Sequence, residues 1–263
     1  MPAAWLIVGL LLYALWVAVA TWIRRAMDDD QDAEGGFIIR VFHVYAAIVH
    51  RLEVVGRGHI PRGRPPGPLI IVANHTAGVD PVLIQSACPF RIRWLMAEDM
   101  RTSVLDPFWE LGQVIMVDRR RGESLGVREA LRHLRAGGVI GVFPEGHLER
   151  PPREVLPFLP GVGVLVARSG ARVQMVTIEG TPQVDPAWSS LWRTSRSRVR
   201  FYEPIDYRGK SAREIPSDLR ARFINALGWP PNEVVPRLVD GRWMQLDVEG
   251  RWPAPGAEAR GVY

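Results

Sequence analysis

The segment Leu-Ile-Ile-Val-Ala-Asn-His-Thr-Ala-Gly-Val-Asp-Pro, residues 69–81, places a strand, a turn and a helix start in immediate succession. Residues 69–73 form a continuous apolar run, which is typical of a strand buried on both faces. Asp80 and Pro81 predict a helix over 82–87, because Asp is favoured at the N-cap and Pro at the first helical position. A strand followed at once by a turn and a helix indicates an α/β protein.

The same alternation continues on both sides of this segment. Further strands are expected at 53–56, 92–96, 114–117, 139–143, 173–178 and 198–202, and helices at 108–111, 125–136 and 162–169. This order predicts an α/β domain over 53–240, built on a mixed, mostly parallel sheet flanked by helices. A polar tail rich in Gly, Pro and Arg is expected over 241–263.

Composition narrows the class of protein. A chain of 263 residues, 47% of them hydrophobic, has room for one sizeable packed domain and an anchor, and is not a disordered protein. Cys88 is the single cysteine, which excludes an intrachain disulfide, and no zinc-type Cys/His cluster supports a metal site. The net charge of +5 favours an anionic partner without choosing between nucleic acid, lipid headgroups and phosphorylated substrates.

The N-terminal residues favour lipid over nucleic acid. No charged side chain occurs from Pro2 to Ile23, and roughly 20 apolar residues suffice to span a hydrocarbon core of about 30 Å. A signal peptide carries its basic segment before the apolar run, whereas Arg24 and Arg25 follow it here. We therefore expect a retained anchor over 1–27, single-pass or monotopic, with the following domain on the cytoplasmic face of the membrane.

Residues 28–52 are expected to form a polar linker followed by a helix from residue 37 onward. Apolar residues recur at helical spacing between Phe37 and Leu52. Two interpretations fit this pattern equally. The helix packs on the domain core, or it is an amphipathic helix that lies at the membrane surface beside the anchor.

His75 and Asp80 are the first candidate catalytic pair. Side chains five positions apart on one regular helix would point about 140° apart. Gly78 and Pro81 interrupt the segment, so a turn can fold His75 back onto Asp80. An Asp that accepts the Nδ1 proton fixes the His tautomer and leaves Nε2 to act as a base. The alternative is that Asp80 only caps its helix and His75 is an ordinary loop residue, and spacing alone leaves both open.

Two further strand ends carry polar residues. Phe-Pro-Glu-Gly at 143–146 places Glu145 beside Gly146, where the backbone can approach a ligand. Arg119 follows the strand at 114–117 and begins a run of three arginines, which suits a phosphate group. A turn with a solvated Glu and a solvated basic loop are the plainer interpretations.

A competing motif lies at 122–126, Gly-Glu-Ser-Leu-Gly, which matches the G-x-S-x-G of hydrolase nucleophile elbows. Such an elbow requires its serine directly after a strand, whereas residues 118–121 intervene before Ser124. The simpler interpretation is that Ser124 begins the helix that follows.

Taken together, these segments resemble the glycerolipid acyltransferase family that includes lysophosphatidate acyltransferases. Asn74, His75 and Asp80 match its H-x4-D box. Residues 112–119 match a block that ends in Arg, 143–146 match Phe-Pro-Glu-Gly, and 173–181 approximate a fourth block that ends at Thr181.

The resemblance implies a membrane-bound O-acyltransferase of phospholipid biosynthesis. His75, oriented by Asp80, would deprotonate the hydroxyl of a lysophospholipid such as 1-acylglycerol-3-phosphate, which attacks the thioester of acyl-CoA or acyl-carrier protein. No cofactor is implied beyond this co-substrate. The resemblance also implies substrate-binding roles for Asn74, Arg119, Glu145, Gly146 and Thr181.

One departure leaves the acceptor open. The family often continues Phe-Pro-Glu-Gly with Thr and Arg, but this chain has His147 and Leu148. Arg120, Arg121 or Arg150 could take over the contact with an acceptor phosphate. Two other functions remain as alternatives: a serine hydrolase that uses Ser124, and an inactive lipid-binding homologue.

Overall fold

A computed structural model describes residues 2–25, 33–63, 66–101, 105–118, 125–234, 237–239, 242–244, 246–247 and 249–252. Arg119, Arg120, Arg121 and Ser124, most of the expected linker, and the end of the expected tail lie outside the described residues.

The domain is built on a seven-stranded sheet with the order β1-β7-β6-β2-β5-β3-β4. All neighbouring pairs are parallel except β6 and β7, so the sheet is mixed and mostly parallel, as expected. Its strands are β1 (Glu53–Val55), β2 (Leu69–Ala73), β3 (Arg93–Ala97), β4 (Ile115–Val117), β5 (Val139–Val142), β6 (Arg172–Glu179) and β7 (Arg198–Phe201).

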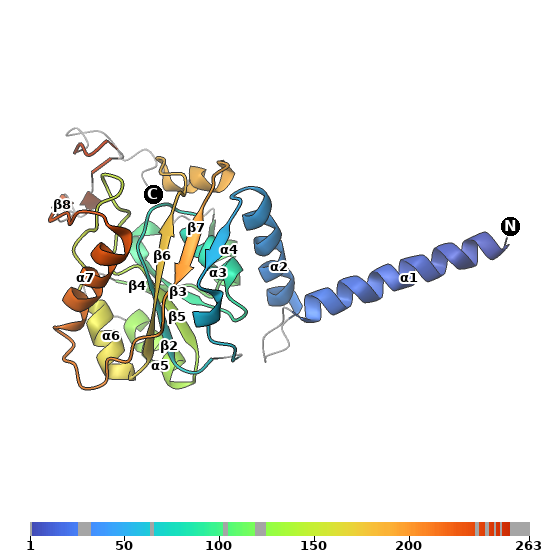
Figure 1. Cartoon of the computed structure of the whole chain (residues 1–263), viewed down its shortest axis with the longest axis horizontal. Helices are drawn as coiled ribbons and strands as arrows, with labels where there is room; N and C mark the ends of the chain where they lie inside the picture. The colour runs from blue at the N-terminus through green and yellow to red at the C-terminus, as the bar shows by residue number, and fades with distance from the viewer. Residues whose placement is uncertain are drawn as a thin grey trace.

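β2 lies at the centre of the sheet because every one of its residues is apolar and buried. Successive side chains of a strand point to opposite faces. Leu69, Ile71 and Ala73 therefore enter one core, while Ile70 and Val72 enter the other. Helices cover both faces (Figure 1). The first core is covered by α2 (Ala33–Ile48) and α3 (Asp80–Ala87), and the second by α5 (Leu125–Arg135), α6 (Gly161–Ser169) and α7 (Ile215–Leu227).

Several expected boundaries need correction. The helix expected at 82–87 begins at Asp80, with Val79 as its N-cap residue and no side-chain cap. The helix expected at 108–111 is α4 (Asp106–Leu111). Sequence reasoning gave no helix at α7. β9 (Arg242–Met244) pairs with β8 (Arg237–Val239), although it falls in the range expected to be a tail. Short 3-10 helices are η1 (Arg57–His59), η2 (Glu98–Met100) and η4 (Ala187–Trp192).

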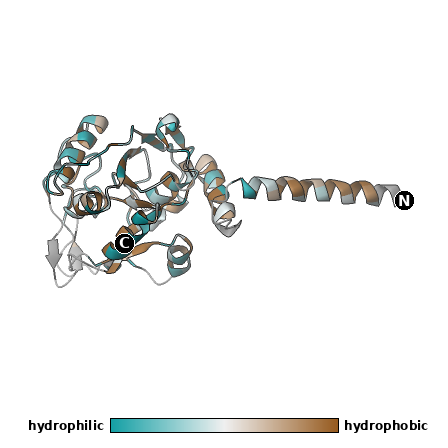
Figure 2. Ribbon diagram, turned by 90° about the horizontal axis from the view of Figure 1, so that it is seen from below, coloured by the Kyte–Doolittle hydropathy of each residue, from teal (hydrophilic) through white to brown (hydrophobic). Residues whose placement is uncertain are grey.

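α1 (Pro2–Arg24) projects away from the domain and is apolar along most of its length (Figures 1 and 2). Residues 5–24 are long and apolar enough to cross a membrane, judged by length and composition, and this is the one such helix in the described chain. Its large side chains are exposed, with Trp5 at 76%. The structure therefore contains the helix that an anchor needs, and its insertion stays a prediction.

α2 has two different faces. It runs from Ala33 to Ile48, so the expected start at 37 and end at 52 are both too late. Ala46 is buried against the first core, and the carbonyl of Ser86 on α3 lies 3.1 Å from His43 Nδ1. The opposite face exposes apolar side chains, namely Phe37, Val41, Val44 and Ile48. Packing of one face on the domain is thus a finding, while contact of the other face with a membrane stays a prediction.

Candidate active site

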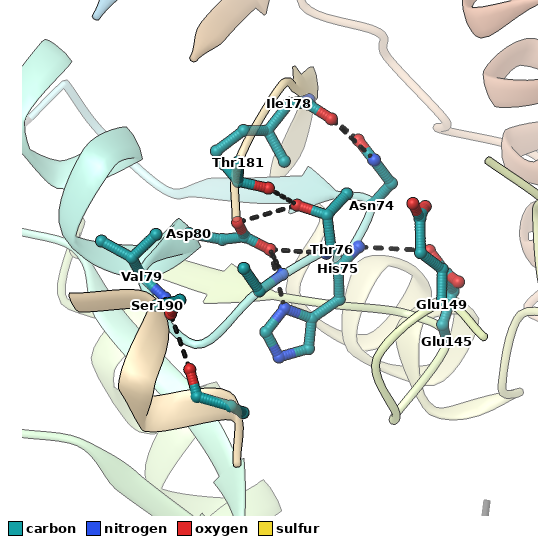
Figure 3. A network of polar contacts seen from close by, with 12 residues as sticks. Asn74, His75, Thr76, Val79, Asp80, Glu145, Glu149, Ile178, Thr181 and Ser190 are labelled. Atoms are coloured by element: carbon teal, nitrogen blue, oxygen red, sulfur yellow. Dashed lines mark hydrogen bonds and ion pairs between the residues drawn. The ribbon is translucent and has the colours of Figure 1, made fainter. Parts of the chain in front are cut away.

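His75 and Asp80 meet at the C-terminal end of the central strand β2. His75 Nδ1 lies 3.0 Å from Asp80 Oδ2, and their side chains are 13% and 0% exposed. Because a carboxylate only accepts hydrogen bonds, Nδ1 carries the proton. Nε2 has no hydrogen-bond partner among the described residues, and the close-up shows it on the ring edge that faces away from Asp80 (Figure 3). The pair therefore presents a free, oriented base.

The carboxylate of Asp80 is held by the turn that it organises. Oδ2 accepts the backbone N–H of Thr76 at 2.6 Å and of Ala77 at 2.8 Å, and Oδ1 accepts the Thr76 hydroxyl at 3.0 Å (Figure 3). Asp80 thus turns back onto the loop before it and does not cap its own helix. The plainer interpretation of this residue as a helix cap is wrong.

η4 packs against the turn between β2 and α3. A Cβ atom on Gly78 would lie 2.7 Å from the carbonyl oxygen of Ala187, so only glycine fits there without a shift of backbone. The backbone N–H of Val79 donates to Ser190 Oγ at 3.1 Å. The loop between β2 and α3 is therefore fixed at the two residues that precede Asp80.

An aromatic stack holds the imidazole ring. The centre of the His75 ring lies 3.9 Å from the centre of the Phe143 ring, and the two ring planes make an angle of 12°. Phe143 stacks in turn on Trp94, with ring centres 4.7 Å apart and an interplanar angle of 11°. Sequence reasoning assigned no role to either aromatic residue. Their signal was available, since Phe143 follows β5 directly and Trp94 lies in the neighbouring strand β3.

Asn74 and Thr181 connect the turn to the end of β6. The Asn74 side chain exchanges two hydrogen bonds with the backbone of Ile178, at 3.0 and 2.9 Å (Figure 3). Thr181 Oγ1 makes a short hydrogen bond to Thr76 Oγ1, the hydroxyl that also reaches Asp80. We expected both residues to contact substrate. In the structure they join two strand ends around the pair, and their contact with substrate stays a prediction.

Glu145 is buried, so the interpretation of a solvated turn residue is wrong. Its Oε1 accepts the backbone N–H of His75 at 3.3 Å, and Oε2 has no partner among the described residues (Figure 3). Burial, and then the neighbouring charge of Glu149, raises the pKa of Glu145 well above its usual value. Gly146 follows in a left-handed conformation with φ 69°, where a side chain would be strained and would meet Leu159.

Glu149 is a site residue that sequence reasoning missed. Its backbone N–H donates to the carbonyl of His75 at 2.7 Å. Its Oε1 accepts the backbone N–H of Arg153 at 3.1 Å and a short bond from Gln183 Nε2. Burial raises the pKa of Glu149 to about 8. Two buried carboxyl groups with raised pKa values thus lie behind the His75 backbone.

Arg150 cannot replace the missing phosphate contact in this arrangement. Its side chain is 1% exposed, and Nη2 forms an ion pair with Asp185 Oδ1 at 3.2 Å. Nη1 donates to the carbonyl oxygens of Thr76 at 3.4 Å and Glu149 at 2.8 Å. Leu148, where an Arg was expected, is also buried. Arg150 therefore holds the turn at 74–79, and of the arginines considered only those at 119–121 remain for an acceptor phosphate.

Comparisons with known proteins place this region of the chain among acyltransferases. The family model "Acyltransferase" matches residues 51–179. An N-acylphosphatidylethanolamine synthase of Arabidopsis thaliana is 32% identical over 42% of this chain and 43% of its own length. A 1-acyl-sn-glycerol-3-phosphate acyltransferase of Borreliella burgdorferi is 30% identical over 50% of this chain and 52% of its own. The chain thus spans about half the length of the curated relatives it matches.

The fold also has a solved counterpart. The crystal structure of the 1-acyl-sn-glycerophosphate acyltransferase PlsC of Thermotoga maritima superposes with a TM-score of 0.59 over 81% of this chain and 89% of that one, at 23% identity. The region matched by the family model contains β2, His75, Asp80 and the 143–146 segment in the expected order. Residues 51–179 thus belong to the acyltransferase family, and the chain is similar in sequence and in fold to glycerolipid acyltransferases.

Proposed function

We propose that this protein is a membrane-bound O-acyltransferase that moves a fatty acyl group from acyl-CoA or acyl-carrier protein to the hydroxyl of a lysophospholipid. One observation carries the proposal. His75 is bonded through Nδ1 to a buried carboxylate and keeps Nε2 free, at the end of a central parallel strand where α/β proteins place their sites. A serine or cysteine nucleophile is not required.

The reaction follows from this arrangement. The acceptor hydroxyl donates a hydrogen bond to His75 Nε2, and its oxygen attacks the thioester carbonyl carbon while its proton passes to Nε2. Asp80 stabilises the imidazolium that forms. When the tetrahedral intermediate collapses, the carbon–sulfur bond breaks and the proton passes from Nε2 to the leaving sulfur. General base catalysis of this kind contributes roughly 10²–10⁴-fold.

Two buried residues, Glu145 and Glu149, would keep the turn in place during proton transfer. Glu145 accepts from the His75 N–H, and Glu149 donates its own backbone N–H to the His75 carbonyl. The backbone of His75, the face of its ring and its Nδ1 atom are thus each held by a neighbouring residue. Only Nε2 is left for substrate. Such preorganisation is where much of the catalytic advantage of an enzyme resides.

The acceptor is proposed as a lysophospholipid such as 1-acylglycerol-3-phosphate, with Arg119 as the phosphate contact. The similarity to a 1-acyl-sn-glycerol-3-phosphate acyltransferase supports this choice. An amine acceptor is the second candidate. It is favoured by the similarity to an N-acylphosphatidylethanolamine synthase and by the buried Leu148 where a phosphate-binding Arg was expected.

A substrate panel tests these proposals directly. Purified full-length protein would be given acyl-CoA or acyl-carrier protein donors with lysophosphatidate, other lysophospholipids or phosphatidylethanolamine. Ester formation on a lysophospholipid supports the first candidate, and amide formation on phosphatidylethanolamine supports the second. Transfer to water alone, together with fluorophosphonate labelling that Ser124→Ala abolishes, would replace both with the serine hydrolase.

Membrane attachment is proposed from α1 and α2. α1 offers a charge-free apolar run from Pro2 to Ile23, and α2 exposes an apolar face beside it. Because Arg24 and Arg25 follow the apolar run, we propose that the domain lies on the cytoplasmic face, whether α1 spans the bilayer or lies in one leaflet.

A further inference from the structure

A cavity of about 300 Å³ lies where α1, α2, the η1 segment and the end of α3 meet. Its polar lining is Arg25, Arg40, His43, Arg57, Arg62 and Ser86. The cavity is separate from the candidate active site. Asp80 begins α3 and Ser86 lies near its end, and a helix of eight residues is about 12 Å long.

The lining of this cavity suits an anion. It contains four arginines, and no carboxylate is among its described lining residues. Arg57 and Arg62 are exposed, and neither forms an ion pair within the described part of the chain. Guanidinium groups bind phosphate oxygens through paired hydrogen bonds. A phosphate group is therefore the ligand that this lining fits best.

Arg40 is already oriented by the membrane helix. Its Nε donates to the carbonyl oxygen of Trp22 at 3.2 Å, and its guanidinium lies 5.3 Å from the centre of the Trp22 ring. Trp22 belongs to the last turn of α1, directly before the charge-free run ends. The cavity is thus built partly from the interfacial end of the apolar helix, where tryptophan is favoured.

The position of the cavity indicates the source of the phosphate. α2 contributes Ile39, Arg40 and His43 to the lining, and the same helix exposes Phe37 and Val41 beside them. Apolar side chains at the surface and arginines next to them match the order of hydrocarbon and headgroup in a bilayer leaflet. Arginines close to a membrane attract anionic lipids.

We propose that this cavity binds the phosphate of an anionic phospholipid headgroup, at a site separate from that of the acyl acceptor. The site goes beyond the proposed acyl transfer, because it concerns how the protein sits on its membrane. α2 runs from the cavity towards the active site, where the Tyr45 hydroxyl donates to the Leu191 carbonyl of η4 at 2.6 Å. A headgroup in the cavity would orient α2 and, through η4, the turn at 74–79 that carries His75.

The test uses the full-length protein in dodecyl maltoside micelles with phosphatidylglycerol that carries a fluorescent acyl chain, and phosphatidylcholine labelled in the same way. Fluorescence anisotropy measures binding of each lipid. The double variant Arg57→Gln/Arg62→Gln is compared with Arg132→Gln/Arg135→Gln, which removes the same charge from exposed positions of α5 on the other face of the sheet.

We expect the cavity variant to bind phosphatidylglycerol about tenfold more weakly or worse, with binding of phosphatidylcholine unchanged. The α5 variant should bind both lipids as the unaltered protein does. Equal losses in the two variants would show a general charge effect and overturn the proposal, as would no loss in either.

Two further arms make the result specific. Inorganic phosphate at millimolar concentration should not displace the labelled lipid, and displacement would show a site for a soluble phosphate ligand instead. Acyl transfer in neutral micelles should be retained by the Arg57→Gln/Arg62→Gln protein. If this variant loses its preference for phosphatidylglycerol but still transfers acyl groups, the cavity acts separately from the proposed acyl transfer. If the variant also loses acyl transfer, the cavity and the active site are not separate, and the proposal is contradicted.

Discussion

At the scale of single residues, the carboxylate of Asp80 sets the geometry of the site. Its two oxygens accept every hydrogen bond that they make. The donors are the His75 ring, two backbone N–H groups and one hydroxyl. A neutral amide would place an NH₂ group against some of these donors, or would reverse the tautomer of His75. The charge and the acceptor geometry of Asp80 therefore matter together.

Asp80→Asn should lower kcat/KM for acyl transfer by about 10²–10⁴-fold, because a wrong tautomer leaves Nε2 protonated and unable to act as a base. Steady-state kinetics with the best donor and acceptor would measure this loss. Asp206→Asn, which alters an exposed ion pair with Arg208, should leave kcat/KM within about twofold. A similar decrease in both variants would count against the orienting role of Asp80.

Glu149 gives a prediction for stability against pH. Its pKa is raised from 4.5 to about 8 in the folded protein, so between these values the folded state holds a proton that the unfolded state has lost. The free energy of unfolding should therefore fall as pH rises from about 4.5 to about 8, by up to roughly 1.4 kcal/mol for each pH unit. Glu145 acts in the same direction.

Glu149→Gln should flatten this dependence, since glutamine resembles the protonated carboxyl and keeps an acceptor for Arg153 and Gln183. The melting temperatures of the variant and of the unaltered protein, measured from pH 5 to pH 8, would show this smaller pH dependence. The exposed Glu203→Gln is the matched control. If the variant and the unaltered protein lost stability in parallel over this range, Glu149 would not hold the proton.

At the scale of elements, the turn at 74–79 is shaped by its contact with η4. Gly78→Ala should displace the turn, because the added methyl group would meet the Ala187 carbonyl at 2.7 Å. We expect a loss of about 1–3 kcal/mol in the free energy of unfolding and at least a tenfold loss in kcat. Gly58→Ala, where no atom lies within 4 Å of the added carbon, is the control for both measurements. Unchanged kcat in Gly78→Ala would mean that η4 does not position His75.

The elements that could be predicted from the sequence were those marked by continuous apolar runs. β2 has the expected bounds at 69–73, since its hydrophobic residues are uninterrupted and proline precedes them. α7 was missed although Ile215, Leu219 and Phe223 recur at helical spacing, because a proline and three charged residues interrupt the apolar pattern between them. Local patterns show a face that is buried, but they do not show what it is buried against.

The same limit explains which parts of the site were found. His75 and Asp80 are close in sequence, so turn residues sufficed to suggest their contact. The partly buried pairings of Glu149 with Gln183 and of Arg150 with Asp185 join residues 34 and 35 positions apart, which the sequence does not connect. Arg150 could therefore be mistaken for a phosphate contact until its ion pair was seen.

At the scale of the whole molecule, α1 and α2 offer two routes to the membrane. Deletion of residues 1–26 should remove most of the membrane-associated protein, because about 20 apolar residues contribute far more transfer free energy than one helix face. Fractionation of membranes, followed by blotting, measures the distribution. If the truncated protein still sediments with membranes, the exposed face of α2 becomes the main contact, and Phe37→Ser/Val41→Ser in the truncated chain should then release it.

The central claim is that His75 is the general base of acyl transfer. The most direct measurement is kcat of purified full-length His75→Ala with the best substrates of the panel, beside the exposed His59→Ala as control. The account predicts a loss of at least about 10²-fold in His75→Ala, an unchanged melting temperature within a few degrees, and full activity in His59→Ala. A folded His75→Ala protein that transfers the acyl group at the rate of the unaltered enzyme would contradict it.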